Sequence, residues 1–140
     1  MRASGVKTAL VSALEAITPD SNAGGEAFRH VDLGGRDPGA ITERAFVVDL
    51  TAIGRSEFIT LDCQVVTYGV TAFYHSYSGV EDRIADDTER MIKAVNRLHE
   101  QDNDLYSVDF EAFDIAPSGV MEGMLEASVE FEITYRRTGV

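Results

Sequence analysis

Three histidines are the first residues to consider for chemistry, because imidazole binds metals and moves protons near neutral pH. They are His30, His75 and His99, and each falls in a different expected element. A zinc site needs several His or Cys ligands at short spacing, and none of the three has such a partner. His75 stands in the aromatic stretch 73–77, which favours a strand end or an interface contact. We therefore expect no metal site.

Cys63 is the only cysteine, so an intrachain disulfide is impossible and a disulfide-stapled secreted scaffold is excluded. A catalytic thiolate needs a nearby base that a third group holds in place. The surrounding residues 61–65 have the pattern of a strand instead. Because a free cysteine most often behaves as a small buried hydrophobe, we expect a structural role for Cys63.

The remaining candidates are a glycine-rich stretch and two adjacent carboxylates. Residues 34–39 are rich in Gly and Pro, but no strong strand precedes them and no Lys-Ser/Thr pair follows to reach phosphate and Mg²⁺. Asp86 and Asp87 could serve acid–base chemistry. They fall in the first turns of an expected helix, however, where carboxylates favour the positive end of the helix dipole. We expect neither a cofactor nor an enzyme.

The charge of the chain is more informative than any single motif. The 140 residues carry a formal net charge of −12, which argues against a nucleic-acid-binding face and against binding to an anionic membrane. Ten acidic residues and no basic one lie between Glu100 and Ile133. One interpretation is a solvated face that keeps the protein soluble. The other is a surface that must not adhere to polyanions, such as the wall of a channel through which DNA passes.

The elements that must position these residues follow from periodicity and turn signals. Ser4 is expected to cap the first helix, and Ser78 with Glu81 has the spacing of a capping box. A β-bulge is expected at Gly69 and a turn at 54–57. The expected order is a helix over 4–17, a long loop over 18–43 with a short strand within 26–32, strands over 44–52 and 57–76, a helix over 78–100, and strands over 105–115 and 123–136.

The last strand has the clearest pattern in the sequence. Apolar residues alternate with polar ones from Leu125 to Arg136, which indicates one buried and one wet face. The wet face carries Glu126, Glu130 and Glu132; on the strand before it, Asp109 and Glu111 are expected to share a face. The residues expected to be buried are Ile84, Met91, Ile92, Val95 and Leu98 of the second helix, and Leu125, Val129, Phe131 and Ile133 of the last strand.

These elements predict one α+β domain over residues 1–140. Its sheet is mostly antiparallel, and both helices pack on one face because each has a single apolar stripe to bury. The loop 18–43 is long and has no apolar pattern of its own, so we expect contacts with another subunit to order it. The sequence has no apolar signal core and no run long enough to span a membrane. It therefore predicts a protein that is made in a cytosol, or packed into a particle assembled there.

The architecture resembles that of the tail terminator (tail completion) proteins of long-tailed bacteriophages. The likeness covers most of residues 3–137 and lies in the order of the elements, since these proteins have no catalytic motif to match. Its parts are a short helix ending at Ile17, a long Gly/Pro loop, a strand ending in Tyr74-His75-Ser76-Tyr77, a helix opening with Ser78-Gly79-Val80-Glu81, and a last strand through Phe131-Glu132-Ile133-Thr134-Tyr135-Arg136.

The resemblance implies a homo-oligomeric ring, usually a hexamer, at the head-proximal end of a virion tail. Such a ring caps the tail-tube protein, stops tube polymerisation and joins a head-side connector or stopper protein; it has no cofactor. DNA would pass through its lumen without sequence-specific contacts, and assembly would take place in the host cytoplasm. Two alternatives remain: a head-closure or neck protein of the same virion, and a small cytosolic ligand-binding or enzymatic domain.

Within such a ring, the sequence suggests roles for two groups of charged residues. The carboxylates of Glu126, Glu130 and Glu132 are expected to face the lumen or one end of it, because an acidic wall would let DNA slide. Six like-charged subunits repel one another, so basic residues are expected to pair with carboxylates across the interfaces. The candidates for this pairing are Arg44, Arg55, Arg83, Arg136 and Arg137.

Overall fold

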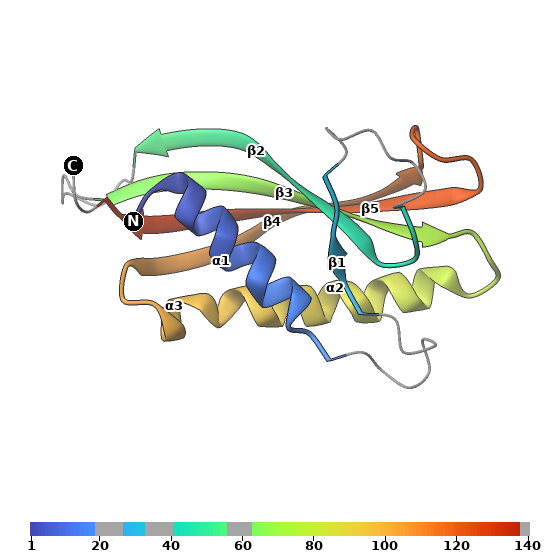
Figure 1. Cartoon of the computed structure of the whole chain (residues 1–140), viewed down its shortest axis with the longest axis horizontal. Coiled ribbons are helices and arrows are strands. Elements are labelled where there is room, and N and C mark those ends of the chain that lie inside the picture. Colours follow the sequence, from blue (N-terminus) through green and yellow to red (C-terminus); the bar gives the residue numbers. More distant parts are fainter. Residues whose placement is uncertain (19–26, 33–40, 56–62, 138–140) are drawn as a thin grey trace.

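A computed structural model describes residues 1–18, 27–55 except 33–40, and 63–137. Its elements run in the order helix, three strands, two helices and two strands (Figure 1). They are α1 (Ala3–Glu15), β1 (Arg29–His30), β2 (Ala45–Arg55), β3 (Cys63–His75), α2 (Val80–Asn96), α3 (Leu98–Gln101), β4 (Leu105–Pro117) and β5 (Met124–Arg136). The predicted α+β class is confirmed.

The five strands form one mixed sheet in the order β1-β2-β3-β5-β4. Only the short β1 is parallel to its neighbour, and the pairs β2–β3, β3–β5 and β4–β5 are antiparallel. The mostly antiparallel sheet was predicted. β3 and β5 pair from Cys63–Arg136 to His75–Met124 without a register shift, so they form the rigid centre of the sheet.

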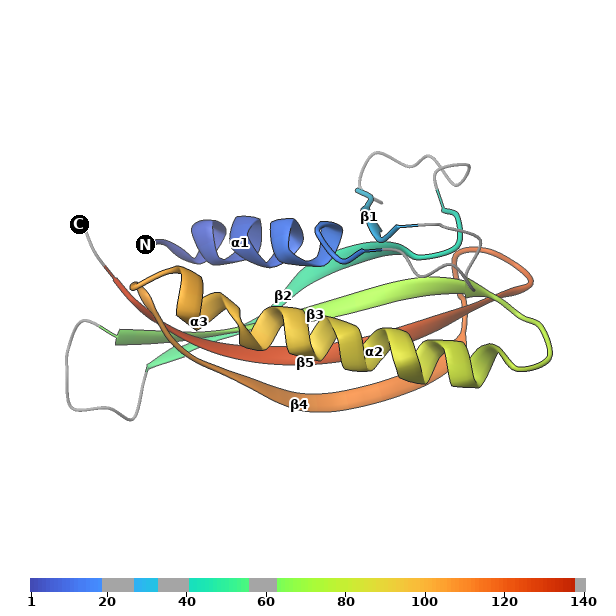
Figure 2. The same cartoon turned by 90° about the horizontal axis from the view of Figure 1, so that it is seen from below.

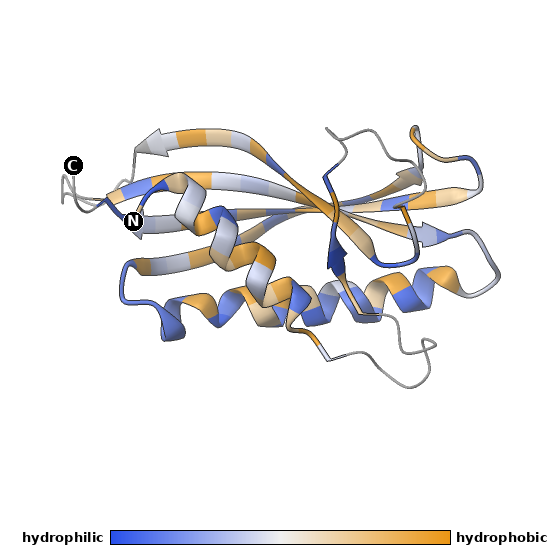
Figure 3. Ribbon diagram, viewed as in Figure 1, coloured by the Kyte–Doolittle hydropathy of each residue, from blue (hydrophilic) through white to orange (hydrophobic). Residues whose placement is uncertain are grey.

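One face of the sheet and the two longer helices enclose the main core. Paired residues of β3 and β5, such as Tyr68 with Phe131 and Val70 with Val129, point to this helix face. α1 contributes Val6, Leu10 and Leu14, and α2 contributes an apolar stripe that alternates with charged residues along the helix (Figure 3). All the residues predicted to be buried are buried or half-buried: Ile92 and Leu125 are half-buried, and the other seven are buried.

A smaller core lies on the opposite face of the sheet. Val31 and Ile41 pack there with Phe73 of β3 and Met124 of β5. Phe28 joins the main core. Described parts of the 18–43 interval therefore pack against their own chain. That another subunit orders this interval stays a prediction, and residues 19–26 and 33–40 lie outside the described residues.

Several predicted details at the ends of elements were wrong. Ser4 lies inside α1, whose N-cap is Arg2. The N-cap of α2 is Gly79, with a φ of 90°, and no side chain caps this helix end. Gly79 reaches this left-handed conformation because it lacks a Cβ, and the backbone geometry moves the helix start one residue past Ser78. β2 also continues through Gly54 to Arg55, where a turn was expected.

The expected bulge at Gly69 lies on the neighbouring strand instead. The β2–β3 register shifts between Leu50 and Ala52, which makes Thr51 the extra residue. Gly69 lies next to the extra residue, but a Cβ at this position would be in ordinary van der Waals contact with Thr51 Cγ2, at 3.4 Å, so the bulge does not require glycine there. Sequence alone shows a glycine in a strand but not which strand carries the irregularity.

Candidate functional site

An acidic face covers the side of the sheet away from the helices. β4 and β5 pair as predicted, with Asp109 opposite Glu132. Glu126, Glu130 and Glu132 alternate with the buried residues of β5 and are half-buried, as their predicted register requires. Like charges directly opposite one another destabilise a sheet. This arrangement therefore has a stability cost that a neutral surface would avoid.

The acidic face differs from its prediction at one position. The β4–β5 register shifts between Phe110 and Ala112, so Glu111 has no partner residue on β5 and leaves the alternation. Asp114 takes its place, opposite Ser128. Asp49 of β2 joins from the other side, since it pairs with Gly69, which pairs in turn with Glu130. The acidic face thus comprises Asp49, Asp109, Asp114, Glu126, Glu130 and Glu132.

Large apolar side chains are exposed at both edges of the same sheet, on its helix face. On the edge strand β4, Phe110 and Phe113 are each 43% exposed, because β4 bows away from α2 (Figure 2). Ile115 continues this row. On β2, Leu50 and Ile53 are each 52% exposed. Their pairing with Tyr68 and Val66 of β3 sets them on the helix face too.

Both edges also leave backbone groups available. Among the described strands, β4 pairs only with β5, and β1 pairs with β2 only at Ala45 and Phe46. Beyond Phe46, no strand within the described residues covers the outer side of β2. Open edges with apolar side chains are templates for pairing with another chain. We name them the β4 edge (Phe110, Phe113, Ile115) and the β2 edge (Leu50, Ile53).

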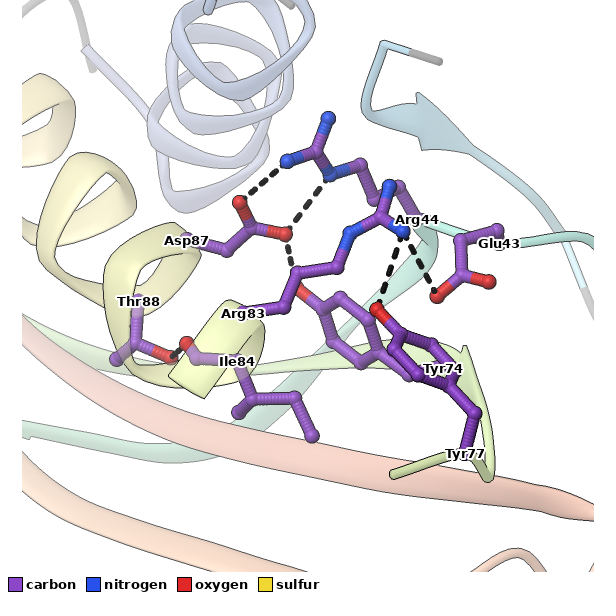
Figure 4. Close-up of polar contacts among 8 residues, drawn as sticks. All are labelled: Glu43, Arg44, Tyr74, Tyr77, Arg83, Ile84, Asp87 and Thr88. Atoms are coloured by element: carbon purple, nitrogen blue, oxygen red, sulfur yellow. Dashed lines mark hydrogen bonds and ion pairs between the residues drawn. The ribbon is translucent and has the colours of Figure 1, made fainter. Parts of the chain in front are cut away.

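A buried ion pair fastens the start of β2 to α2 (Figure 4). Arg44 donates from Nε and Nη2 to the two carboxylate oxygens of Asp87, at 2.8 and 2.6 Å. Tyr74 donates its hydroxyl to the same carboxylate at 2.9 Å. Arg44 is 1% exposed and Asp87 0%. Because no solute reaches these groups, we interpret the cluster as a structural fastening.

Arg44 also has an unusual backbone conformation, with a φ of 63°. A non-glycine residue in this left-handed region costs about 1–2 kcal/mol. The conformation is held because Arg44 N donates to Phe73 O and Arg44 O accepts from Arg29 N. The guanidinium lies 5.4 Å from the centroid of the Phe28 ring. Arg44 is therefore an intrachain ion-pair partner and not the surface arginine that the sequence suggested.

The other predicted interface arginines lie in different places. Arg83 is half-buried, donates to the Tyr77 hydroxyl at 3.2 Å and lies 3.9 Å from a Glu43 carboxylate oxygen. Arg136 and Arg137 are exposed at the end of β5. The side chain of Arg55 lies outside the described residues. The cross-subunit role of these four arginines stays a prediction.

The sequence contained a signal for Asp87 that the dipole argument missed. Asp87 is three residues after Ile84 and four before Met91, which puts it on the buried stripe of α2. A carboxylate on an apolar stripe requires a partner. Its neighbour Asp86 is exposed, and the carboxylates in the first turn of α2, where the dipole acts, are those of Glu81 and Asp82.

Burial raises the pKa of Tyr74 far above its ordinary value near 10, and the adjacent Asp87 carboxylate raises it further. A folded-state pKa above the unfolded value gives stability that is present below pH 10 and lost as the pH rises further. We expect the free energy of unfolding to fall by about 1.4 kcal/mol per pH unit above pH 10 through this residue. Tyr74→Phe should remove that part of the slope in urea titrations.

Among the described residues, no three His, Cys, Asp or Glu side chains gather closely enough to hold a metal ion. Of the helices described, none combines the length and the apolar character that a membrane crossing requires. No protein-family model matches the chain, and no curated protein matches it. The likeness to tail terminators therefore rests on the order of its elements.

Proposed function

We propose that this protein is the subunit of a closed ring that works as a tail terminator of a long-tailed phage. The observation that carries the proposal is the pair of open sheet edges. The β2 and β4 edges are different surfaces at opposite sides of one sheet, and both expose apolar side chains on the helix face. When one edge of a copy meets the other edge of the next, the contact is head-to-tail, and such contacts form rings when the rotation closes.

The charge distribution supports the same arrangement. If sheets join edge to edge with their helices outward, the opposite face turns inward. That face carries the half-buried Glu126, Glu130 and Glu132 together with Asp49, Asp109 and Asp114. An acidic lumen repels the phosphate backbone and lets DNA pass, whereas a basic one would bind it. In this proposal the ring caps the tail tube and meets the head-side connector.

The test is the mass of the particle in solution and its image. Light scattering should give a discrete oligomer, with six subunits expected, and electron microscopy should show a ring with the acidic face lining the lumen. A protein that stays monomeric at high concentration, alone and with tail-tube protein, would contradict the proposal. A ring with Glu126, Glu130 and Glu132 on its outer rim would retain the assembly but remove the lumen argument.

Reversing the charge of the acidic face should create DNA binding. We expect E126K/E130K/E132K to bind a 30-base-pair duplex at least tenfold more tightly than the wild type, with a steeper salt dependence. Fluorescence anisotropy measures both. The matched control is E81K/E89K/E100K, which reverses three exposed helix carboxylates. An equal gain in the control would show that the position of the acidic face does not matter.

A further inference from the structure

A hollow between the helices lies away from both sheet edges and from the acidic face. Its volume is about 720 Å³. One side is lined by Ala9 and Ala13 of α1 and by its C-cap Ala16, and the other by Lys93 and Arg97. The buried side chain of Leu98 forms the floor of the hollow. The small side chains of α1 let another backbone approach closely, and the basic side attracts an acidic partner.

The exposed side of α2 carries that acidic partner within the same chain. Four exposed charged residues lie along it. The acidic ones are Asp82 and Asp86 in the first half of α2; the basic ones are Lys93 in the second half and Arg97 directly after the helix. At 3.6 residues per turn the four fall within roughly 60° around the helix. The buried residues Ile84, Met91 and Val95 lie on the opposite side. The acids and bases thus form one stripe, divided by sign along its length.

We propose that the hollow binds α2 of a second copy in an antiparallel, two-fold contact. When two α2 helices pair antiparallel with their centre between Glu89 and Arg90, Asp82 faces Arg97 and Asp86 faces Lys93. The same two pairs repeat by symmetry, as a self-complementary contact requires. The acidic half of each helix then lies along the basic side of the other copy's hollow.

This contact differs from the edge-to-edge contact of the proposed ring and does not depend on it. It uses α1 and α2 instead of β2 and β4, and it is two-fold instead of head-to-tail. Exposed ion pairs are individually weak and are screened by salt. We therefore expect a dimer that forms at tens of micromolar protein in 50 mM salt and dissociates at least tenfold more readily in 0.5 M salt.

Charge reversal tests the proposal in full-length protein that carries F110D/F113D, so that edge contacts do not contribute. In sedimentation velocity, K93E/R97E and D82K/D86K should each raise the dimer dissociation constant at least tenfold, because like charges then face each other. An equal mixture of the two should recover the starting value to within threefold. If circular dichroism shows that F110D/F113D is not folded, the same comparison is made in protein without these two substitutions. The two-fold dimer is then distinguished from the ring by its mass.

Three results would overturn the proposal. One is self-association that neither reversal changes. Another is a loss in K93E/R97E but not in D82K/D86K, because the basic hollow would then take an acidic segment of the second copy other than the first half of its α2. The third is failure of the mixture to recover, since the two halves of α2 would then not face each other. Loss of the ring by itself affects none of these results.

Discussion

Replacing Asp87 with alanine is expected to lower the free energy of unfolding by about 3–5 kcal/mol, because the buried guanidinium of Arg44 loses the carboxylate that balances its charge. Tyr74 would lose its acceptor as well. For a domain of this size the melting temperature should fall by about 10 °C or more. Urea unfolding and thermal melts measure both quantities.

The neighbouring residue provides a matched control. Asp86→Ala removes the same group from the exposed side of α2 and should change stability by about 0.5 kcal/mol or less. Replacing the whole cluster by apolar residues of similar size, as R44M/D87L/Y74F, should recover much of the loss, because no charge is then left buried. Equal effects of the Asp86 and Asp87 substitutions would show that the ion pair does not fasten β2 to α2.

The second large effect is expected on assembly. Replacing Phe110 and Phe113 with aspartate should convert the proposed ring to monomers in 0.5 M salt, which also dissociates the two-fold α2 contact. The reason is that the β4 edge would place charges in an apolar contact. Both side chains are substantially exposed in the single chain, so the fold should remain. Light scattering measures the first expectation and circular dichroism the second. Val120→Asp, at an apolar side chain that is 50% exposed in the β4–β5 turn, is the control.

A mixing experiment separates a head-to-tail contact from a symmetric one. In the same 0.5 M salt, L50D/I53D should also be monomeric, because it damages the β2 edge. Each variant retains the edge that the other has lost, so a mixture should form dimers that grow no further. If L50D/I53D assembles normally while F110D/F113D does not, two β4 edges must meet each other, and the proposed ring interface is wrong.

The parts of the fold that were predictable depend on local periodicity. The alternation around Val129 and Phe131 determined which face Glu126, Glu130 and Glu132 occupy, because a strand has a period of two wherever its pairing is regular. The same argument failed at Glu111, since a bulge depends on how two strands meet. Gly79 as the N-cap of α2 was missed for a related reason, because the chain path into the helix sets its start.

The candidate site was less predictable than the fold. Asp87 could have been found from its spacing to Ile84 and Met91. Its partner could not, because Arg44 is 43 residues away in sequence and its left-handed backbone is held by contacts with Phe73 and Arg29. The β4 edge depends on the curvature of β4, which leaves Phe110 uncovered although its pattern resembles that of a buried residue.

The strand order also has a consequence for how the protein is made. β5 lies between β3 and β4, yet the ribosome synthesises it after both. β3 must therefore leave one side unpaired until some sixty further residues have emerged, whereas β4 is followed by its partner β5 after a short turn. Pairing over such sequence separations is slow. A nascent chain would expose an unpaired side of β3 until β5 has been synthesised. We therefore expect this protein to need chaperones during synthesis more than a sheet made of consecutive hairpins does.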